Sequence, residues 1–598
     1  MGQRHTLVHQ LMDWAAREPA KGAIFGKKPG GGWKEYAWRE FYQAVRKTAK
    51  GLIALGHTEG DCVAIVGDNR PEWVICQLGI MAANGIPAPI YATNTQAQAA
   101  YIVSHSRAKI AICDNATQLA KYQAAMAEEQ MSVEKIVTMD PIRGHGEGVM
   151  SLDELMALGD QQADAELDSR VGSIEADKTC LLIYTSGTTG VPKAVELTHE
   201  GMISVARSLI ERAPYLEHEE YRSVSYLPLC HVAEQIFTTM LSLERGGQVY
   251  FCPDLKQVKD YLVEVRPTIF LGVPRVWEKF EAALRDKLGQ ATGVKASLAR
   301  WALKTELASF KASLRAGREV GGVRRKMANK LVISKIKDAL GLDQLKLAAT
   351  GAAPISVSTQ EFFASLGIVV LEGYGMSETS GVATVNDPDK PIFGSVGRAL
   401  SCVEIKIAED DEVLLKGVNM TRSYLHMPDE TEELYTEDGW MHTGDLGRLD
   451  SEGNLYITGR KKDLIITAGG KNVAPTEIED HIKRIPGVGQ AVVVGDQQPY
   501  LCALVTLDSE KLGELCGELG ISNGSVADVA QNPKTREFIE KRIESECNAK
   551  LARYQTVKKF EILPIEFTVD GGEMTPTMKL KRNVINDKYK DVIDGFYA

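Results

Sequence analysis

A short loop of glycine, serine and threonine between two apolar stretches constrains this chain more than any other feature of its sequence. Residues 181–184 form an apolar run typical of a buried strand, and residues 194–197 are predicted to form a second strand. The glycines between them allow backbone amides to turn toward an anion, the hydroxyl side chains add donors, and a lysine adds positive charge. The pattern predicts a polyphosphate-binding loop made of Thr185, Ser186, Gly187, Thr188, Thr189, Gly190 and Lys193.

This loop differs from the Walker loop, which has four residues between its glycines and continues through Gly-Lys-Ser/Thr into a helix. Here two residues separate Gly187 from Gly190, and Lys193 follows a proline. A hydroxyl-rich surface loop that simply joins two strands is the alternative.

Strand-like and helix-like segments alternate over the first 170 residues. Residues 38–53 and 72–83 are predicted helices, whereas 61–66 and 109–113 are short apolar runs typical of strands. This alternation favours a mostly parallel sheet covered by helices. The predicted fold class is therefore α/β, with a large N-terminal domain of helix-covered β-sheets.

A charged cluster, Arg-Lys-Lys-Asp at 460–463, is typical of an exposed linker. Beyond it the pattern predicts strands at 464–467 and 491–494 and helices at 476–483 and 534–551. We therefore expect two domains, residues 1–460 and 461–598, of which the second is small and α+β.

Composition excludes several classes of protein. The net charge of −11 argues against a general nucleic-acid binder, which carries a basic excess. The ten cysteines have no regular spacing, as expected for reduced thiols of a cytoplasmic protein. Residues 1–19 lack the apolar core of a signal peptide, and no apolar run is long enough to span a membrane.

Small residues follow a predicted strand at 346–350, and an aromatic turn follows another at 368–371. The small residues Gly351, Ala352 and Ala353 allow a flat ring to lie against the backbone. Tyr374, between Gly373 and Gly375, is suited to stacking on a purine, and Glu378 is a carboxylate available to a hard metal ion. A turn tyrosine and a surface glutamate are the alternative.

Three polar residues lie in other parts of the chain where they can contact a ligand. His231 precedes an apolar helix predicted at 231–243, and a hydrogen-bonded core histidine is the alternative there. Asp445 ends an extended stretch, where its carboxylate can accept both hydroxyls of a ribose. Arg460 can pair with ribose or phosphate.

Two sequence motifs resemble those of the AMP-forming acyl-adenylating superfamily: Tyr-Thr-Ser-Gly-Thr-Thr-Gly-x-Pro-Lys and, later in the chain, Gly-Tyr-Gly-x-Ser-Glu. That superfamily includes acyl-CoA synthetases, luciferases and adenylation domains of peptide synthetases. Near the chain end, Thr-Pro-Thr-x-Lys-Leu-Lys-Arg resembles long-chain fatty acyl-CoA synthetases, and Gly-Ala-Ala-Pro-Ile-Ser is similar to their bubblegum-type group. The resemblance spans roughly residues 20–585.

The resemblance implies an ATP-dependent long-chain fatty acid–CoA ligase with Mg²⁺ as cofactor and with ATP, CoA and a fatty acid as substrates. Lys579 would be the catalytic lysine, and His231 would lie between the acid and the nucleotide. The family binds phosphate through the loop named above and Ser377, and magnesium through Glu378, to which we add Thr185 as a possible second ligand. Adenine and ribose would contact Gly351, Ala352, Ala353, Gly373, Tyr374, Asp445 and Arg460.

The resemblance also implies that the small domain rotates about a hinge between two half-reactions. That hinge would be Lys462, and a glycine loop at Gly469, Gly470 and Lys471 would face CoA. Val232, Ile236, Phe237 and Met240 are candidate linings of an acyl tunnel, with ordinary core packing as the alternative for each.

The stretch 276–338 is helical in pattern and basic. It holds fifteen Lys and Arg against six Asp and Glu, with its densest charge at Arg324, Arg325 and Lys326. Peripheral contact with anionic lipid is one interpretation, with Trp301, Leu303 and Phe310 as an apolar face. A solvated helical face and contact with the phosphates of CoA are the others. The oligomeric state is left open.

Three competing functions share these motifs. A peptide-synthetase adenylation domain would pass its acyl group to a carrier thiol, and a luciferase-like oxygenase would use oxygen in the second step. A non-catalytic nucleotide-binding scaffold is the third, although every phosphate, metal and lysine position is filled.

Overall fold

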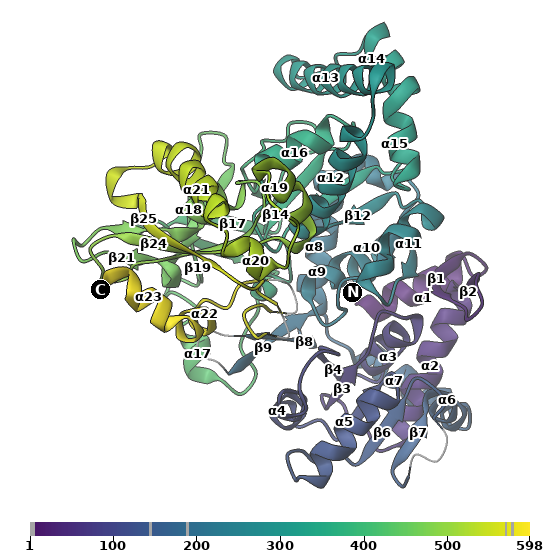
Figure 1. Ribbon diagram of the computed structural model, residues 1–598. Coiled ribbons are helices and arrows are strands. Elements are labelled where there is room, and N and C mark those ends of the chain that lie inside the picture. The colour runs from purple at the N-terminus through teal and green to yellow at the C-terminus, as the bar shows by residue number, and fades with distance from the viewer. Residues whose placement is uncertain (1–5, 143–145, 187–190, 569–570, 576–578) are drawn as a thin grey trace. The chain divides into compact units, whose positions relative to one another are not determined.

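The computed structural model describes residues 6–142, 146–186, 191–568, 571–575 and 579–598. The chain forms two compact units. Unit 1 comprises residues 1–405, 415–441 and 450–455, and unit 2 comprises 406–414, 442–449 and 456–598. Figure 1 shows helices covering β-sheets in each unit, and the α/β fold class is confirmed.

The first sheet of unit 1 is parallel, with strand order β4-β3-β5-β6-β7. Its strands β3 (Cys62–Val66), β4 (Ile86–Ile90), β5 (Ile110–Cys113), β6 (Lys135–Thr138) and β7 (Val149–Ser151) alternate with helices α3 (Pro71–Ala82), α4 (Gln96–Ser106) and α5 (Ala116–Ala127). Pro87 and Pro89 lie in β4, where the edge position tolerates a missing amide donor. The predicted strand–helix alternation is therefore confirmed.

Unit 1 contains two further sheets and a two-stranded hairpin. In the order β12-β13-β14-β15-β16, strands β12 (Ile269–Leu271), β13 (Leu347–Thr350) and β14 (Val370–Tyr374) are parallel, while β15 (Thr384–Val385) and β16 (Arg398–Ala399) are antiparallel. A mixed sheet contains β10 (Arg222–Ser225), β11 (Gln248–Phe251), β1 (Gly22–Lys27) and β2 (Trp33–Ala37). A hairpin of β8 (Thr179–Ser186) and β9 (Pro192–Thr198) flanks the phosphate loop.

Buried side chains between these sheets and their helices form the core of unit 1. One cluster packs α4 and α5 against the parallel sheet, with Tyr122 fully buried. Another surrounds Trp277 of α12 (Pro274–Gly289) and Phe363 of α16 (Val357–Ala364), whose rings make an edge contact at 4.8 Å. Unit 1 also contains helices α1 (Leu7–Arg17), α2 (Trp38–Ala54), α6 (Leu152–Asp160), α7 (Asp164–Ser173), α8 (His199–Arg212) and α11 (Val258–Val265).

The predicted helix at 231–243 is not continuous. The structure has α9 (Val232–Gln235), a π-helical turn over Ile236–Met240, and α10 (Leu241–Arg245). Buried polar side chains bond along this segment: Thr238 donates to Glu234 at 2.5 Å and Thr239 to Gln235 at 2.9 Å. The apolar pattern predicted the helix but gave no sign of its widened turn.

A long helical projection follows α12. Helix α13 (Gly293–Ala316) packs against α14 (Val323–Ala328) and the π-helical turn Asn329–Ile333, and α15 (Ser334–Ala339) leads back toward the sheets. These helices lie at the outer edge of unit 1 (Figure 1). None of the described helices is both long and apolar enough to cross a bilayer.

Unit 2 contains a three-stranded sheet of order β23-β24-β25, formed by Val488–Val494, Leu501–Leu507 and Val557–Leu563. Helices α18 (Pro475–Lys483) and α21 (Pro533–Arg542) contribute Ile478, Ile482 and Ile539 to its apolar core. The helix predicted at 534–551 changes to a π-turn at Ile543–Cys547 and a 3-10 turn at Asn548–Lys550. Helices α19 (Leu512–Leu519), α20 (Val526–Ala530), α22 (Arg582–Lys588) and α23 (Lys590–Tyr597) complete the unit.

Residues from β17 (Val403–Ile407), β18 (Glu412–Gly417), β19 (Met441–Leu449) and β20 (Leu455–Arg460) also contribute to unit 2. The division at 460/461 stays a prediction about functional domains. All ten cysteines lie in the described part of the chain; none is in a disulfide, and all but the half-buried Cys402 are buried.

Candidate functional site

The predicted phosphate loop connects the ends of the β8–β9 hairpin. In the strand register Thr185 lies opposite Lys193, and Ser186 opposite Pro192. The hydroxyl of Tyr101 donates to the carbonyl of Pro192 at 3.0 Å, which ties the hairpin to α4. Gly187, Thr188, Thr189 and Gly190 lie outside the described residues, so the structure gives the frame of the loop.

Parallel pairing of β13 with β14 brings two separate sequence motifs together. Thr350 is opposite Glu372, so the segment that begins at Gly351 lies next to Gly373 at the carboxyl ends of the strands. A Cβ at Gly351 would lie 3.1 Å from the Gly373 carbonyl oxygen. Ala352 has a φ of 68°, a left-handed conformation that is unusual for alanine. Ala353 follows it on the same loop, and Tyr374 ends β14 half-buried. This surface has the small residues that a nucleoside ring needs for close approach.

The turn after Tyr374 has no room for a side chain at Gly375. A Cβ there would lie 1.9 Å from the carbonyl oxygen of Gly381. The following short 3-10 turn, Ser377–Thr379, buries Ser377 and Glu378. The close backbone packing therefore fixes where the Glu378 carboxylate lies.

Tyr424 connects this turn to the phosphate hairpin, and sequence reasoning missed it. Its hydroxyl donates to Glu378 Oε1 at 2.8 Å, and the Lys193 ammonium lies 4.9 Å from its ring centroid. Burial, followed by the negative charge of Glu378, raises the pKa of Tyr424, so the phenol remains protonated. Its motif, Arg-Ser-Tyr-Leu, has no local pattern that indicates this role.

Glu378 fits the predicted magnesium site. The part of the chain that the structure describes contains no group of three or more His, Cys, Asp or Glu residues arranged to hold a metal ion. Mg²⁺ does not need such a group, because it commonly takes one or two carboxylates together with substrate phosphates and water. A single buried carboxylate whose orientation is fixed by a phenol suits that ligand set.

His231 caps the helix that was predicted to line the acyl tunnel. Its Nδ1 accepts the amide of Ala233 at 3.1 Å, and the side chain is half-buried. Val232 and Ile236 of this helix pack toward Gly381, where an added Cβ would lie 2.5 Å from Ile236 Cδ1. The structure therefore brings the His231 helix against the loop that follows Glu378.

A buried glutamate lies one turn beyond His231. Glu234 is 2% exposed, accepts the amide of Leu227 at 3.0 Å and accepts the hydroxyl of Thr238 at 2.5 Å. Burial raises its pKa to about 7 despite these hydrogen bonds. The expected apolar helix thus has a buried polar side.

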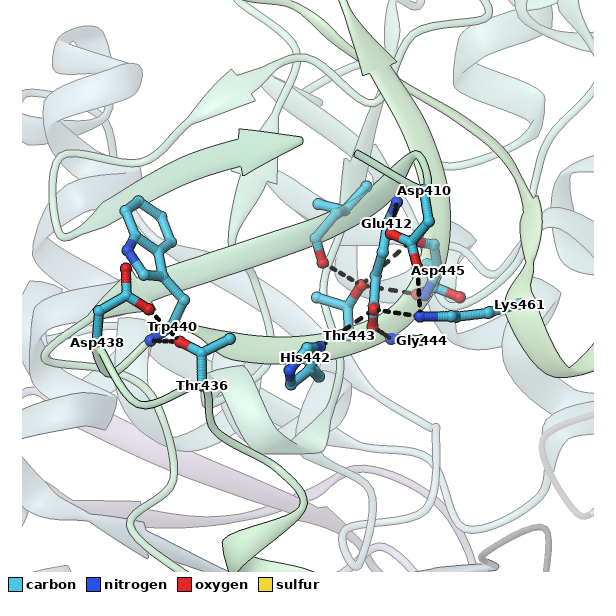
Figure 2. A network of polar contacts seen from close by, with 11 residues as sticks. Asp410, Glu412, Thr436, Asp438, Trp440, His442, Thr443, Gly444, Asp445 and Lys461 are labelled. Atoms are coloured by element: carbon cyan, nitrogen blue, oxygen red, sulfur yellow. Dashed lines mark hydrogen bonds and ion pairs between the residues drawn. The ribbon is translucent and has the colours of Figure 1, made fainter. Parts of the chain in front are cut away.

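In unit 2 the predicted ribose residues meet. Arg460 Nε lies 2.9 Å from Asp445 Oδ1, and the Asp445 side chain is buried while Arg460 is exposed. The amide of Gly444, the residue before Asp445, donates to Glu412 Oε1 at 2.9 Å. Figure 2 shows this carboxylate together with Asp410, His442 and Lys461.

Glu412 is a second residue that sequence reasoning missed. Its side chain is 4% exposed, and its Oε2 lies 2.9 Å from Lys461 Nζ and 3.1 Å from His442 Nδ1. Burial alone would raise the pKa of Glu412, but the hydrogen bonds from Lys461, Gly444 and His442 lower it below its usual value. The carboxylate therefore stays charged and joins three separate points of unit 2.

The predicted hinge is a 3-10 turn, Lys461–Asp463, whose Lys462 is exposed. The predicted CoA-side loop is the tip of a hairpin between β21 (Ile465–Ile466) and β22 (Asn472–Val473). Gly469, Gly470 and Lys471 are all exposed, and Gly470 has a φ of 70°. The positive φ suits glycine at this turn.

Lys579 is exposed on a second tight loop. Its amide donates to Thr575 Oγ1 at 3.0 Å, and its carbonyl accepts the amide of Thr575 at 2.8 Å. Nearby, Arg582 pairs with the buried Glu479 through both nitrogens of its fork, at 2.7 and 2.5 Å. Lys579 and the phosphate hairpin belong to different units, so their approach to each other is part of the proposal below.

A cavity of about 240 Å³ lies at the other end of the β13 and β14 strands. Its lining includes Leu347, Ala348 and Ile368, at the amino ends of these strands. Ligands of parallel sheets bind beyond the carboxyl ends, where Gly351 and Gly373 lie. We therefore do not assign the nucleotide to this cavity.

Comparisons with known proteins place most of the chain in one enzyme family. Residues 11–425 match the model of the AMP-binding enzyme family, and residues 462–598 match that of the AMP-binding enzyme C-terminal domain. The long-chain-fatty-acid–CoA ligase ACSBG2 of Xenopus laevis is 36% identical, covering 99% of this chain and 83% of the relative. ACSBG1 of Homo sapiens, also named a long-chain-fatty-acid–CoA ligase, is 33% identical over 99% of this chain and 85% of its own.

Solved structures share the fold. ATP-bound MatB from Rhodopseudomonas palustris superposes with a TM-score of 0.71 at 23% identity, covering 98% of this chain and 99% of that one. The anthranilate CoA ligase AuaEII in complex with anthranoyl-AMP gives a TM-score of 0.70 at 19% identity, covering 98% of both chains.

Proposed function

This chain belongs to the AMP-binding enzyme family, and from that premise we propose that it is an AMP-forming long-chain fatty acid–CoA ligase. In the first step the fatty acid carboxylate attacks the α-phosphorus of ATP, forming an acyl-adenylate and releasing pyrophosphate. In the second the CoA thiol attacks the adenylate carbonyl, forming acyl-CoA and releasing AMP. The observation that carries the proposal is the similarity, over 99% of this chain, to ligases of this name.

In the first step, negative charge develops on phosphoryl oxygens, so catalysis depends mainly on positioning and electrostatics. The 185–193 loop would hold the β- and γ-phosphates with Ser377, and Lys193 would add positive charge beside them. Lys579 would bridge the attacking carboxylate and the α-phosphate. In this proposal the hairpin register and the Tyr424 contact keep Lys193 and Glu378 oriented before the substrate arrives.

The nucleoside would lie over the carboxyl ends of β13 and β14. Tyr374 would stack on adenine, while Gly351, Ala352, Ala353 and Gly373 allow the ring to approach the backbone. Asp445 would accept the ribose hydroxyls, with Arg460 holding the carboxylate. Mg²⁺ would be held by Glu378, with Thr185 as a possible second ligand, and when bound it neutralises charge on the phosphates.

The second step needs CoA in place of pyrophosphate. We propose that the domain 461–598 rotates about Lys462 and presents Gly469, Gly470 and Lys471 to CoA. Such a change lets one site exclude water in both steps.

The acyl chain would enter beside His231, with Val232, Ile236, Phe237 and Met240 as lining candidates. Each buried methylene contributes about 0.8 kcal/mol, so a long chain gains several kcal/mol from an apolar tunnel. We further propose that the basic region 276–338 makes peripheral contact with the cytoplasmic face of a membrane.

One assay tests the function. Purified protein is supplied with ATP, Mg²⁺, CoA and fatty acids of graded length, and AMP, acyl-CoA, oxygen uptake and light are measured. Production of AMP and acyl-CoA that increases with chain length is the expected result. ATP binding without turnover would indicate a scaffold, and oxygen uptake or light would indicate an oxygenase.

A further inference from the structure

Three large apolar side chains project from one side of the outer helix of unit 1. Val323, Met327 and Leu331 are 75%, 50% and 41% exposed. They lie four residues apart on α14 and the π-turn that continues it, so they share one face. We call this face, together with its flanking basic residues, the α14 face.

The opposite side of the same helix is firmly packed. Ala328 and Ile333 are fully buried together with Ala302 of α13. Arg325 forms three hydrogen bonds of 2.7–3.0 Å with Glu306, which is only 2% exposed. These hydrogen bonds to Glu306 raise the pKa of Arg325, so its guanidinium stays charged. The packing fixes the helix rotation and directs the three apolar side chains into solvent.

Positive charge surrounds the apolar stripe. Arg324, Lys326 and Lys330 are exposed, and their helical positions lie on both sides of the stripe. Residues 320–337 contain six Lys and Arg and no Asp or Glu, although the whole chain is acidic. An apolar stripe with cationic borders matches the interface of an anionic bilayer, where aliphatic groups enter the acyl boundary and ammonium groups meet phosphates.

We propose that the α14 face seats unit 1 on a membrane that contains anionic phospholipid, inserting Val323, Met327 and Leu331 between the headgroups. The inference deepens the peripheral contact proposed above and rests on it. The geometry replaces the sequence-based face of Trp301, Leu303 and Phe310, each of which is at least half-buried. A docked enzyme would receive an amphiphilic acid from the bilayer rather than from water.

The test is flotation of the full-length protein with vesicles of phosphatidylcholine, with and without phosphatidylserine. One variant carries Val323→Ser, Met327→Ser and Leu331→Ser; a second carries Arg324→Gln, Lys326→Gln and Lys330→Gln. A matched control changes exposed residues near α11: Leu255→Ser, Lys256→Gln, Lys259→Gln and Val263→Ser. Thermal unfolding checks that every variant is folded.

We expect the protein to float only with anionic vesicles, and each α14-face variant to bind about tenfold more weakly or worse. The control should stay within about twofold of wild type, and added salt should weaken binding by screening. Equal flotation of wild type and both α14-face variants, equal loss in the control, or no flotation at all would overturn the inference. Absence of flotation would favour an acidic protein surface, in place of a membrane, as the partner of the α14 face.

Ligase turnover is measured separately with a water-soluble acid in the absence of vesicles. The α14-face variants should keep wild-type turnover there, because no residue of the α14 face belongs to the proposed site. Flotation without any AMP formation would contradict the ligase function and leave membrane docking intact. Normal turnover without flotation would contradict membrane docking and leave the ligase function intact.

Discussion

The ammonium of Lys461 lies 2.9 Å from the carboxylate of Glu412, which also accepts the amide of Gly444 at 2.9 Å (Figure 2). One buried carboxylate therefore joins the residue beside the predicted hinge to the strand that carries Asp445. Lys461 also pairs with Asp410 at 2.6 Å, and these two bonds raise its pKa. Movement of the hinge must break or carry along this arrangement.

Replacing Glu412 by Gln should loosen the strand segment that carries Asp445, the proposed ribose ligand. The glutamine side chain carries no charge and cannot accept from the Lys461 ammonium, the His442 ring and the Gly444 backbone amide as a carboxylate does. Hydrogen bonds to charged groups contribute about 2 kcal/mol to stability. We expect the KM for ATP in pyrophosphate exchange to rise roughly tenfold. Asp410→Asn, at the exposed partner of Lys461, should change it little. An unchanged KM in Glu412→Gln would contradict the positioning role.

Lys579→Ala should remove adenylate formation while ATP binding stays largely intact. In the proposed mechanism Lys579 brings one positive charge to the reacting groups, and its loss is expected to reduce the rate by about a hundredfold or more. Pyrophosphate exchange measures the reaction, and equilibrium binding of labelled ATP measures affinity. Lys590→Ala, an exposed lysine of α23, is the control. Full turnover by Lys579→Ala would refute the assignment.

Tyr424→Phe should weaken the use of magnesium without removing the aromatic ring beside Lys193. The variant deletes the 2.8 Å bond that orients Glu378, a bond to a charged group. We expect the Mg²⁺ concentration for half-maximal activity to rise about tenfold. Tyr435→Phe removes the hydroxyl of a half-buried tyrosine that bonds to the carbonyl of Thr421 instead, and it should have less effect. Identical Mg²⁺ titrations of both variants would argue against a site at Glu378.

Glu234 should make the folded protein less stable as pH rises. Its pKa is about 7 when folded and 4.5 ordinarily, so the folded state keeps a proton that the unfolded state releases. This contribution is fully present below pH 4.5 and is lost as pH rises to about 7, a change of about 3 kcal/mol by linkage.

Urea unfolding of wild type and Glu234→Gln across that pH range measures the effect. The unfolding free energy of wild type minus that of Glu234→Gln should fall as pH rises from 4.5 to about 7. The pH-dependent contributions of the other carboxylates are the same in both proteins and cancel in this difference. A difference that is constant with pH would show that Glu234 titrates normally.

Local patterns predicted much of the fold. The helix expected at 38–53 is α2, whose apolar residues recur at helical spacing, while the helix at 72–83 is α3 and the strand at 109–113 is β5, both of them apolar stretches that are buried almost throughout. The family resemblance implied that Gly351 and Gly373 contact one nucleoside, and the structure places both just beyond the paired residues Thr350 and Glu372 of two parallel strands.

Side-chain partners distant in sequence were not predictable. Tyr424 is 46 residues from Glu378, and Glu412 is 49 residues from Lys461; no local pattern records either contact. The π-turn at Ile236–Met240 was missed for a related reason. Its buried polar bonds depend on three-dimensional neighbours such as Leu227 and Gln77.

The same π-turn has a consequence for how this segment can change. A π-turn holds one more residue than the α-helical turn it replaces, and each helical residue advances the side-chain direction by about 100°. Loss of a single residue within 236–240 would therefore convert the π-turn to an ordinary α-helical turn and leave Leu241 to Arg245 facing as they do now relative to α9. A one-codon deletion, rather than a substitution, is thus the smallest change that would remove the widened turn and keep the helical segments on either side of it.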